Sequence, residues 1–189
     1  MKKLLAIFLL AGSAHAETMS SMYSGFDIDK CKKISVSEPD EGGQWKCKGI
    51  KGFDVFYAEG DLRGTLSFGP NANSQCSQSQ SFGHFNSPGK KIEWRLKNGK
   101  PIATIVRWLT DSGEPGGKQN WLVVTKLNGK DACRSAIVDT KVPKANLVAQ
   151  QMADKSASFN CKNDTVEVIG VTNVNGGDIM TSSPCAPAN

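Results

Sequence analysis

The sequence predicts a β-dominated protein, an antiparallel sandwich or flattened barrel of about eight to ten strands with one helix near residues 144–157. Three observations predict this class. Two Asn-Gly pairs, at 98–99 and 128–129, stand between segments of alternating hydrophobicity, as in β-hairpins with type I′ turns. Only one stretch has helical periodicity. The length of 189 residues, with 39% hydrophobic and 22% charged, suits a single domain with its own core.

Residues 1–16 have the three regions of a secretory signal peptide. The chain opens with Met-Lys-Lys, continues with an unbroken apolar run over 4–10, and reaches an Ala-His-Ala triplet that fits the small-x-small cleavage rule. A membrane span would need roughly 20 apolar residues, so we do not expect an anchor here. We expect cleavage after Ala16, leaving one disulfide-stabilised β domain over 17–189 in the periplasm or outside the cell.

The first half of the domain is predicted to contain short strands and a polar loop. A strand is expected at 45–48, followed by a hairpin of 53–58 and 62–68 around Glu59-Gly60-Asp61. The stretch 69–81 is rich in Asn, Ser and Gln and is expected to be a loop.

The hairpin over 91–106 has the clearest signal, because Asn98-Gly99 favours a two-residue turn with positive φ at both positions. That turn predicts three cross-strand pairs on one apolar face: Leu96 with Pro101, Trp94 with Ala103, and Ile92 with Ile105. In this register Arg107 falls on the apolar face unless a bulge intervenes, and Trp108 falls on the opposite face.

The second half continues the pattern and contains the helix. Residues 121–127 and 130–138 form a hairpin, and the apolar run from Trp121 indicates a central strand covered on both faces. Pro143 fits the first turn of the helix, which has four apolar residues at helical spacing: Ala145, Val148, Ala149 and Met152. A last hairpin is expected between 159–161 and 166–168.

Six cysteines lie after the expected cleavage site, an even number that predicts three disulfides in an oxidising compartment. A metal site would favour closely spaced pairs, and the nearest two cysteines are 16 positions apart. Short loop closure favours one pairing among fifteen: Cys31–Cys47, Cys76–Cys133 and Cys161–Cys185.

Three segments resemble parts of uncharacterised exported proteins of Gram-negative, mainly alphaproteobacterial, bacteria. They are Phe53-Asp-Val-Phe-Tyr-Ala-Glu-Gly-Asp-Leu-Arg63, Ile92-Glu-Trp-Arg through Ala103-Thr-Ile-Val-Arg-Trp108, and Trp121-Leu-Val-Val-Thr-Lys126 with Ala132-Cys133. The resemblance covers roughly residues 45–162. It implies a periplasmic location, and it assigns no activity and no site residues.

The charge pattern argues against nucleic acid as a partner. Loss of Lys2 and Lys3 from the 23 basic residues leaves 21 against 18 acidic ones, a net charge of +3. No run of basic residues after the signal segment is longer than two, so the chain has no basic patch in its sequence.

Motifs of catalysis and cofactor binding are absent from the sequence. His84 is the single histidine after Ala16, and its surroundings lack the Gly-x-Ser-x-Gly elbow, so we interpret it as a loop histidine. Glu59 and Asp61 could form a carboxylate pair for glycoside chemistry, but acids beside a glycine in a turn favour turn hydrogen bonds. The chain has no phosphate loop and no calcium loop, and we expect no cofactor.

These observations favour a non-catalytic periplasmic module that binds a protein or an envelope polymer, with an inhibitor or immunity-type role included. The candidate interaction surface combines aromatic and basic residues: His84, Phe85, Arg107 and Trp108. Two alternatives stay open. One is a cell-envelope hydrolase that uses His84 or the Glu59/Asp61 pair, and the other is a structural or stress-resistance protein without a discrete ligand.

Overall fold

The computed structural model describes residues 17–36, 42–50, 52–111, 117–128, 131–170 and 185, so the expected signal peptide lies outside the described residues. Within these described residues, ten strands form one sheet: β1 Met19–Gly25, β2 Lys32–Val36, β3 Gly43–Lys48, β4 Asp54–Gly60, β5 Arg63–Phe68, β6 Asn86–Lys97, β7 Lys100–Asp111, β8 Lys118–Asn128, β9 Asp131–Asp139 and β10 Glu167–Ile169. The helix α1 spans Ala145–Lys155, and a 3₁₀ turn at Ser156–Ser158 follows it. The predicted β-dominated class and the position of the helix are confirmed.

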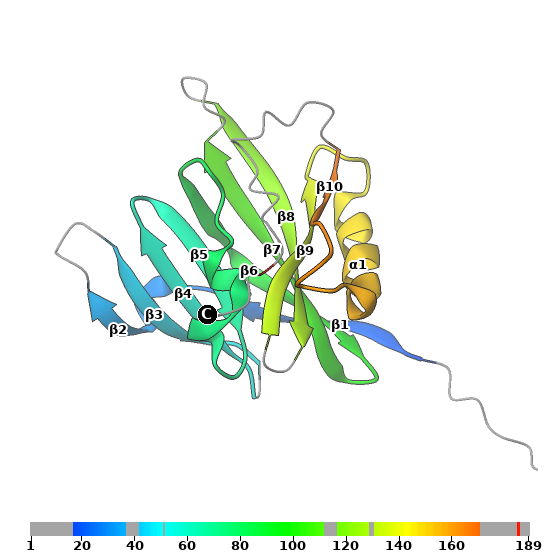
Figure 1. Cartoon of the computed structure of the whole chain (residues 1–189), viewed down its shortest axis with the longest axis horizontal. Helices are drawn as coiled ribbons and strands as arrows, with labels where there is room; N and C mark the ends of the chain where they lie inside the picture. Colours follow the sequence, from blue (N-terminus) through cyan, green and yellow to red (C-terminus); the bar gives the residue numbers. More distant parts are fainter. Residues whose placement is uncertain are drawn as a thin grey trace, which may run out of the picture.

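The sheet runs in the order β10-β9-β8-β7-β6-β5-β4-β3-β2, with β1 paired to β6, and it is not closed into a barrel. Two neighbouring pairs, β5 with β6 and β9 with β10, are parallel, so the sheet is mixed and not wholly antiparallel. A single residue pair, Arg63 with Asn86, joins β5 to β6. The β2–β5 half and the half from β6 onward therefore diverge on either side of this junction (Figure 1).

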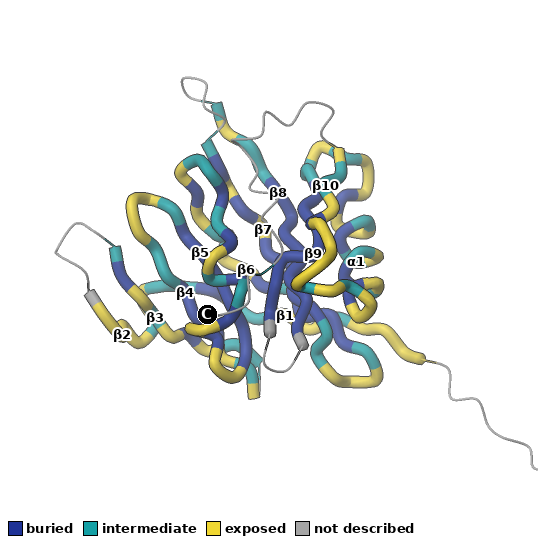
Figure 2. Tube along the Cα trace, viewed as in Figure 1, coloured by how far each residue is buried: buried dark blue, intermediate teal, exposed yellow. Residues whose placement is uncertain are grey.

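The main core lies between these two halves. Buried side chains from β3, β4 and β5 pack against others from β6, β7, β8 and β9 in one apolar cluster. Trp94 is central to it: the ring contacts Phe53 and Phe68 with centroid distances of 5.9 and 5.5 Å, and its Nε1 donates to Ser24 Oγ of β1. Figure 2 shows the middle of the sheet as buried and much of β1 and β2 as exposed.

A second core lies between α1 and the other face of β7, β8 and β9. Ala145, Ala149 and Ala153 recur every four residues on the buried side of the helix, and their small side chains allow close packing on the strands. Because β8 contributes Trp121 and Val123 to one core and Leu122 and Val124 to the other, it is covered on both faces, as predicted. An ion pair between Arg95 and Asp154 also joins β6 to α1.

The β6–β7 hairpin has the predicted turn but a different register beyond it. Asn98 and Gly99 have φ of 50° and 76°, as a type I′ turn requires, and Leu96 pairs with Pro101. A register shift then follows, so Trp94 pairs with Thr104 and Ile92 with Val106. The predicted pairs of Trp94 with Ala103 and of Ile92 with Ile105 are wrong, because the shift sends Ala103 and Ile105 to the helix side.

The expected hairpin between 159–161 and 166–168 does not form. Instead β10 pairs in parallel with β9, which places Val168 beside Ile137. The strands β1 and β2 were not predicted; both have mostly exposed side chains, so neither has the clear apolar alternation of the inner strands.

All six cysteines form disulfides, as predicted: Cys31–Cys47, Cys76–Cys185 and Cys133–Cys161. The Cys31–Cys47 pairing is confirmed, and the predicted Cys76–Cys133 and Cys161–Cys185 pairings are wrong. The prediction used short loop closure, whereas the fold brings Cys185 to Cys76 across 109 positions. None of the helices in the described part of the chain has the length and hydrophobicity needed to cross a bilayer.

Candidate functional site

The candidate site lies where the β4–β5 turn meets the start of β6 and the end of β7. Besides the pairing of Arg63 with Asn86, the Asn86 backbone N–H donates to the Leu62 carbonyl at 2.9 Å. The Asp111 N–H donates to the Phe85 carbonyl at 3.0 Å, which attaches the end of β7 to the same place. Main-chain hydrogen bonds from segments far apart in the sequence therefore set the geometry of this site.

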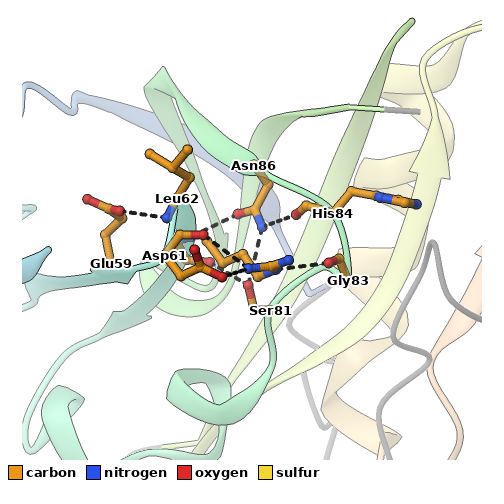
Figure 3. A network of polar contacts seen from close by, with 9 residues as sticks. Glu59, Asp61, Leu62, Ser81, Gly83, His84 and Asn86 are labelled. Carbon is orange, nitrogen blue, oxygen red and sulfur yellow. Dashed lines mark hydrogen bonds and ion pairs between the residues drawn. The ribbon is translucent and has the colours of Figure 1, made fainter. Parts of the chain in front are cut away.

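The buried side chain of Asn86 holds the 81–86 loop against β5. Its Oδ1 accepts the Gly64 backbone N–H at 3.0 Å, and its Nδ2 donates to the His84 carbonyl at 2.9 Å and to Ser81 Oγ at 3.3 Å (Figure 3). With three partners, this buried amide is well satisfied. It gives the loop that carries Phe85 a defined position.

The β4–β5 turn has an unusual backbone for its residues. Asp61 and Leu62 have φ of 49° and 57°, a left-handed conformation that costs an L-residue roughly 1–2 kcal/mol and that Asn or Gly normally occupies in such turns. Local bonds support it: Glu59 Oε1 accepts the Leu62 N–H at 3.1 Å, and Arg63 forms an ion pair with Asp61. The result is a leucine held at the tip of a turn.

A cleft of about 430 Å³ opens beside this turn. Its lining includes three apolar side chains that are unusually exposed for their type, at 60, 43 and 40%: Leu62, Phe85 and Leu109. It also includes three charged side chains, of which the last two form an ion pair with each other: Glu59, Asp111 and Lys118. Apolar groups grouped around one hollow are typical of an interaction site.

The guanidinium group of Arg63 lies over the Phe85 ring. The Arg63 guanidinium carbon lies 5.1 Å from the ring centroid, and Arg63 Nε donates to the Gly83 carbonyl at 2.9 Å. This cation–π contact restrains an aromatic side chain that remains 43% exposed. A restrained aromatic ring loses little conformational entropy when a partner covers it.

Tyr57 forms part of the cleft lining, and the residue as a whole is only 6% exposed. Burial, and then the nearby negative charge of Glu59, raise the pKa of Tyr57 to about 12. The phenol is therefore neutral at physiological pH. It can donate a hydrogen bond to a ligand, but it is a poor general base.

The sequence-predicted catalytic candidates do not form a catalytic arrangement. Glu59 and Asp61 take part in the turn bonds described above, and the His84 imidazole points away from both carboxylates (Figure 3). Ser81 Oγ donates to the Gly64 carbonyl at 3.0 Å, so its proton is engaged by the backbone. The turn interpretation of the two acids fits this geometry.

The four residues of the predicted interaction surface do not share one surface. Phe85 lines the cleft, and His84 precedes it in the same loop. The prediction that Trp108 lies on an interaction surface is wrong. Trp108 is 2% exposed and packs against Phe82 in the core, because the β6–β7 register shift turns its side chain inward. Arg107 is exposed on the opposite face of β7.

Sequence reasoning missed eight of the ten lining residues, among them Leu62, Leu109, Asp111 and Lys118. The turn was expected one position earlier, so Leu62 was assigned to a strand. A leucine directly after Gly-Asp at a hairpin turn is the one local signal that could have pointed to it. The others meet only through the tertiary fold.

Among the described residues, one group of three possible metal ligands lies close together: Cys133, Cys161 and Cys185, whose sulfur atoms are within 4.8 Å of one another. Each of these cysteines is in a disulfide, and a disulfide sulfur lacks the thiolate charge that binds zinc. The group does not fit a metal in this oxidised form.

Comparisons with protein-family models, with curated proteins and with solved structures find no match for this chain. The function must therefore be inferred from the chemistry of the cleft.

Proposed function

We propose that this protein is a non-catalytic binding module of the periplasm or the extracellular space. Its partner is a protein segment that places an apolar side chain, flanked by a basic one, in the cleft beside Phe85. An inhibitor or immunity-type role falls within this proposal. The observation that carries it is the group of three exposed apolar side chains around one cleft, Leu62, Phe85 and Leu109.

The apolar lining supports a protein partner. Covering a half-exposed Leu or Phe contributes about 1 kcal/mol each, since full burial is worth about 1.5–3 kcal/mol. Well-placed aromatic anchors with apolar neighbours are the usual energetic centre of a protein interface. Envelope polysaccharides present mainly hydroxyl groups and would leave Leu62 and Leu109 without matching contacts, so we favour a protein over a polymer.

The charges of the cleft support a basic flank on the partner. The lining contains two carboxylates, Glu59 and Asp111, and one lysine, Lys118, which pairs with Asp111, so it carries one net negative charge. A partner with Lys or Arg beside its apolar anchor complements this charge, whereas an acidic segment is repelled.

Three observations support the proposed location. Three disulfides favour an oxidising compartment, and residues 1–16 have the sequence pattern of a signal peptide. The resemblance to exported bacterial proteins points the same way. We expect the protein recovered from the periplasm of an expressing bacterium to begin at Glu17; amino-terminal sequencing that still reads Met-Lys-Lys would contradict this.

The binding proposal is tested by panning a random peptide library displayed on phage against the folded, oxidised protein. We expect enriched peptides that combine an aromatic or aliphatic residue with an adjacent Lys or Arg. Phe85→Ala should weaken a selected peptide at least about 10-fold, the effect of losing a central anchor. Leu147→Ala is the matched control, because Leu147 is 48% exposed on α1, outside the cleft. Equal affinity of wild type and Phe85→Ala would contradict the proposal.

The same protein preparations discriminate the alternatives. Hydrolysis of peptidoglycan or of generic esters by the wild type, abolished by His84→Ala, Glu59→Gln or Asp61→Asn, would replace the binding module with an enzyme. If no peptide is selected and no turnover is measured, a structural role becomes the better explanation.

A further inference from the structure

Three strands of the sheet pair on one side only among the described residues: β1, β2 and β10. β10 has only three residues, and β2 carries Lys32 and Lys33 with a register shift beside them. Short length, lysines and bulges are the features by which natural edge strands avoid pairing with other chains. β1 has none of these features, because its seven residues contain no charge and no proline and pair with β6 without a register shift.

The free edge of β1 presents main-chain groups that can accept another strand. At one end of the β1–β6 pair the Phe26 N–H donates to the Lys90 carbonyl at 2.9 Å, and at the other end the Asn98 N–H donates to the Thr18 carbonyl at 2.9 Å. Main-chain groups alternate in direction along an antiparallel strand, so the even-numbered residues of β1 bond to β6. The N–H and C=O groups of the odd-numbered residues therefore point to the edge where no described strand pairs: Met19, Ser21, Tyr23 and Gly25.

β1 also carries exposed apolar side chains. In the part of the chain that the structure describes, eight large apolar side chains are exposed, and three of them lie on this strand: Met19, Met22 and Tyr23. The Tyr23 ring is restrained, because Lys91 Nζ lies 4.1 Å from its centroid. Apolar side chains gathered along an open, uncharged edge are typical of a strand that pairs with another chain.

We propose that β1 is a dimerisation strand, which pairs antiparallel with β1 of a second copy of this chain across a two-fold axis at Met22. In this register Met22 faces its own counterpart, Ser21 faces Tyr23, and Ser20 faces Ser24, so no pair brings like charges together. The odd-numbered residues of the two strands also face each other, so their free main-chain groups form hydrogen bonds.

The absence of charge on β1 favours a second copy as the occupant of this edge. A two-fold interface uses the same surface on both subunits, so the strand must be compatible with itself. β1 meets this condition, whereas the same pairing at β2 would bring lysines of both copies together. β1 also offers no charge that would select an acidic or a basic strand of another protein.

The dimer goes beyond the proposed binding function and does not depend on it. The cleft contains no residue of β1, and its β6 residues, Asn86 and Ser87, precede the segment Lys91–Lys97 that pairs with β1. Each dimer therefore has two clefts. A partner that displays two copies of the bound segment would be held more tightly by the dimer than by one cleft.

Sedimentation velocity of the folded, oxidised protein tests the dimer. Two paired strands of seven residues make a smaller interface than the roughly 1,200–2,000 Å² of stable complexes, so we expect a reversible monomer–dimer equilibrium within about 1–300 μM protein. Met22→Lys places two lysines opposite each other at the axis and should raise the dissociation constant at least about 10-fold. Ile34→Lys on β2 is the matched control, because Ile34 is 51% exposed and Met22 is 49% exposed. A monomer at every concentration, or a dimer that Met22→Lys leaves unchanged, would overturn the proposal.

An introduced thiol tests the register of the two strands. Directly opposite residues of a non-hydrogen-bonded antiparallel pair have Cα atoms about 4.5 Å apart, within the range that a disulfide spans. Under mild oxidation Met22→Cys should therefore give a covalent dimer on a non-reducing gel. Ile34→Cys carries the same extra thiol on the β2 edge and should remain monomeric. Equal cross-linking of the two variants, or none in Met22→Cys, contradicts pairing across Met22.

Discussion

Replacing Arg134 by methionine should stabilise the protein, although it removes two aromatic contacts. The Arg134 side chain is 3% exposed and lies between two rings, with its guanidinium carbon 4.5 Å from the Phe82 centroid and 5.6 Å from that of Trp108. Its Nη1 has no hydrogen-bond partner among the described residues. Burial alone lowers the pKa of Arg134 to about 9.

The expected change in the free energy of unfolding is the difference between two opposing contributions. A pKa unit corresponds to 1.36 kcal/mol, so the fall from the usual value above 12 to about 9 is a penalty of about 5 kcal/mol on the charged form. Each desolvated cation–π contact offsets about 2 kcal/mol of it. A buried methionine keeps the length of the side chain and contacts both rings through sulfur. We expect Arg134→Met to raise the free energy of unfolding by about 1–3 kcal/mol.

The pH dependence gives a second measure of the same effect. At neutral pH, Arg134 is charged in the folded and in the unfolded protein, so the penalty applies there. Because burial lowers the pKa of Arg134 in the folded state, alkaline pH favours the folded wild type. The advantage of Arg134→Met should therefore shrink, and not grow, as the pH rises.

Urea unfolding followed by circular dichroism, at neutral pH and above pH 9, measures both effects. Arg107→Met is the control, because Arg107 is exposed on the neighbouring part of the sheet, and its replacement should change stability by less than about 0.5 kcal/mol. If Arg134→Met is less stable than the wild type at neutral pH, the aromatic contacts outweigh desolvation and the reasoning is wrong.

Three further predictions concern other parts of the fold. Arg95→Ala breaks an ion pair in which two hydrogen bonds of 2.8 Å join Arg95 to Asp154, and it should lower the free energy of unfolding in urea by about 3 kcal/mol. Replacing both residues by apolar residues of similar size should lower it clearly less. Leu62→Gly removes the strain of a left-handed leucine and should change the free energy of unfolding by no more than about 1 kcal/mol. Calorimetric titration should nevertheless show that the variant no longer binds the peptides selected by phage display. Replacing Cys31 and Cys47 by serine opens a 16-residue separation and should lower the unfolding free energy by about 3 kcal/mol, measurable by thermal or urea denaturation.

Much of the local structure follows from the sequence. The turn at Asn98-Gly99 is predictable because both residues adopt positive φ more readily than most others. The central position of β8 follows from an apolar run that fits burial on both faces. The helix α1 follows from four apolar residues at helical spacing, Ala145, Val148, Ala149 and Met152. The six cysteines likewise predict three disulfides, although not their partners.

The sequence alone does not determine which face of the β6–β7 hairpin is buried. A register shift of one residue reverses which side of the sheet every following side chain occupies, so Trp108 becomes core and Arg107 becomes exposed. Sequence alternation alone does not locate such a bulge, because both registers give an apolar face. The packing of the two sheet halves decides between them.

The cleft and the Cys76–Cys185 pairing belong wholly to the tertiary structure. Leu62, Phe85 and Leu109 come from three segments that meet where β5 pairs with β6 and where the end of β7 bonds to the segment before β6. Cys76 is bonded to Cys185 across 109 positions. Loop-closure entropy favours partners that are nearer in the sequence, but the contacts of the folded chain outweigh this preference. Backbone preferences and hydrophobic period are properties of neighbouring residues and can be read from the chain, whereas contacts between distant residues depend on how the assembled layers pack.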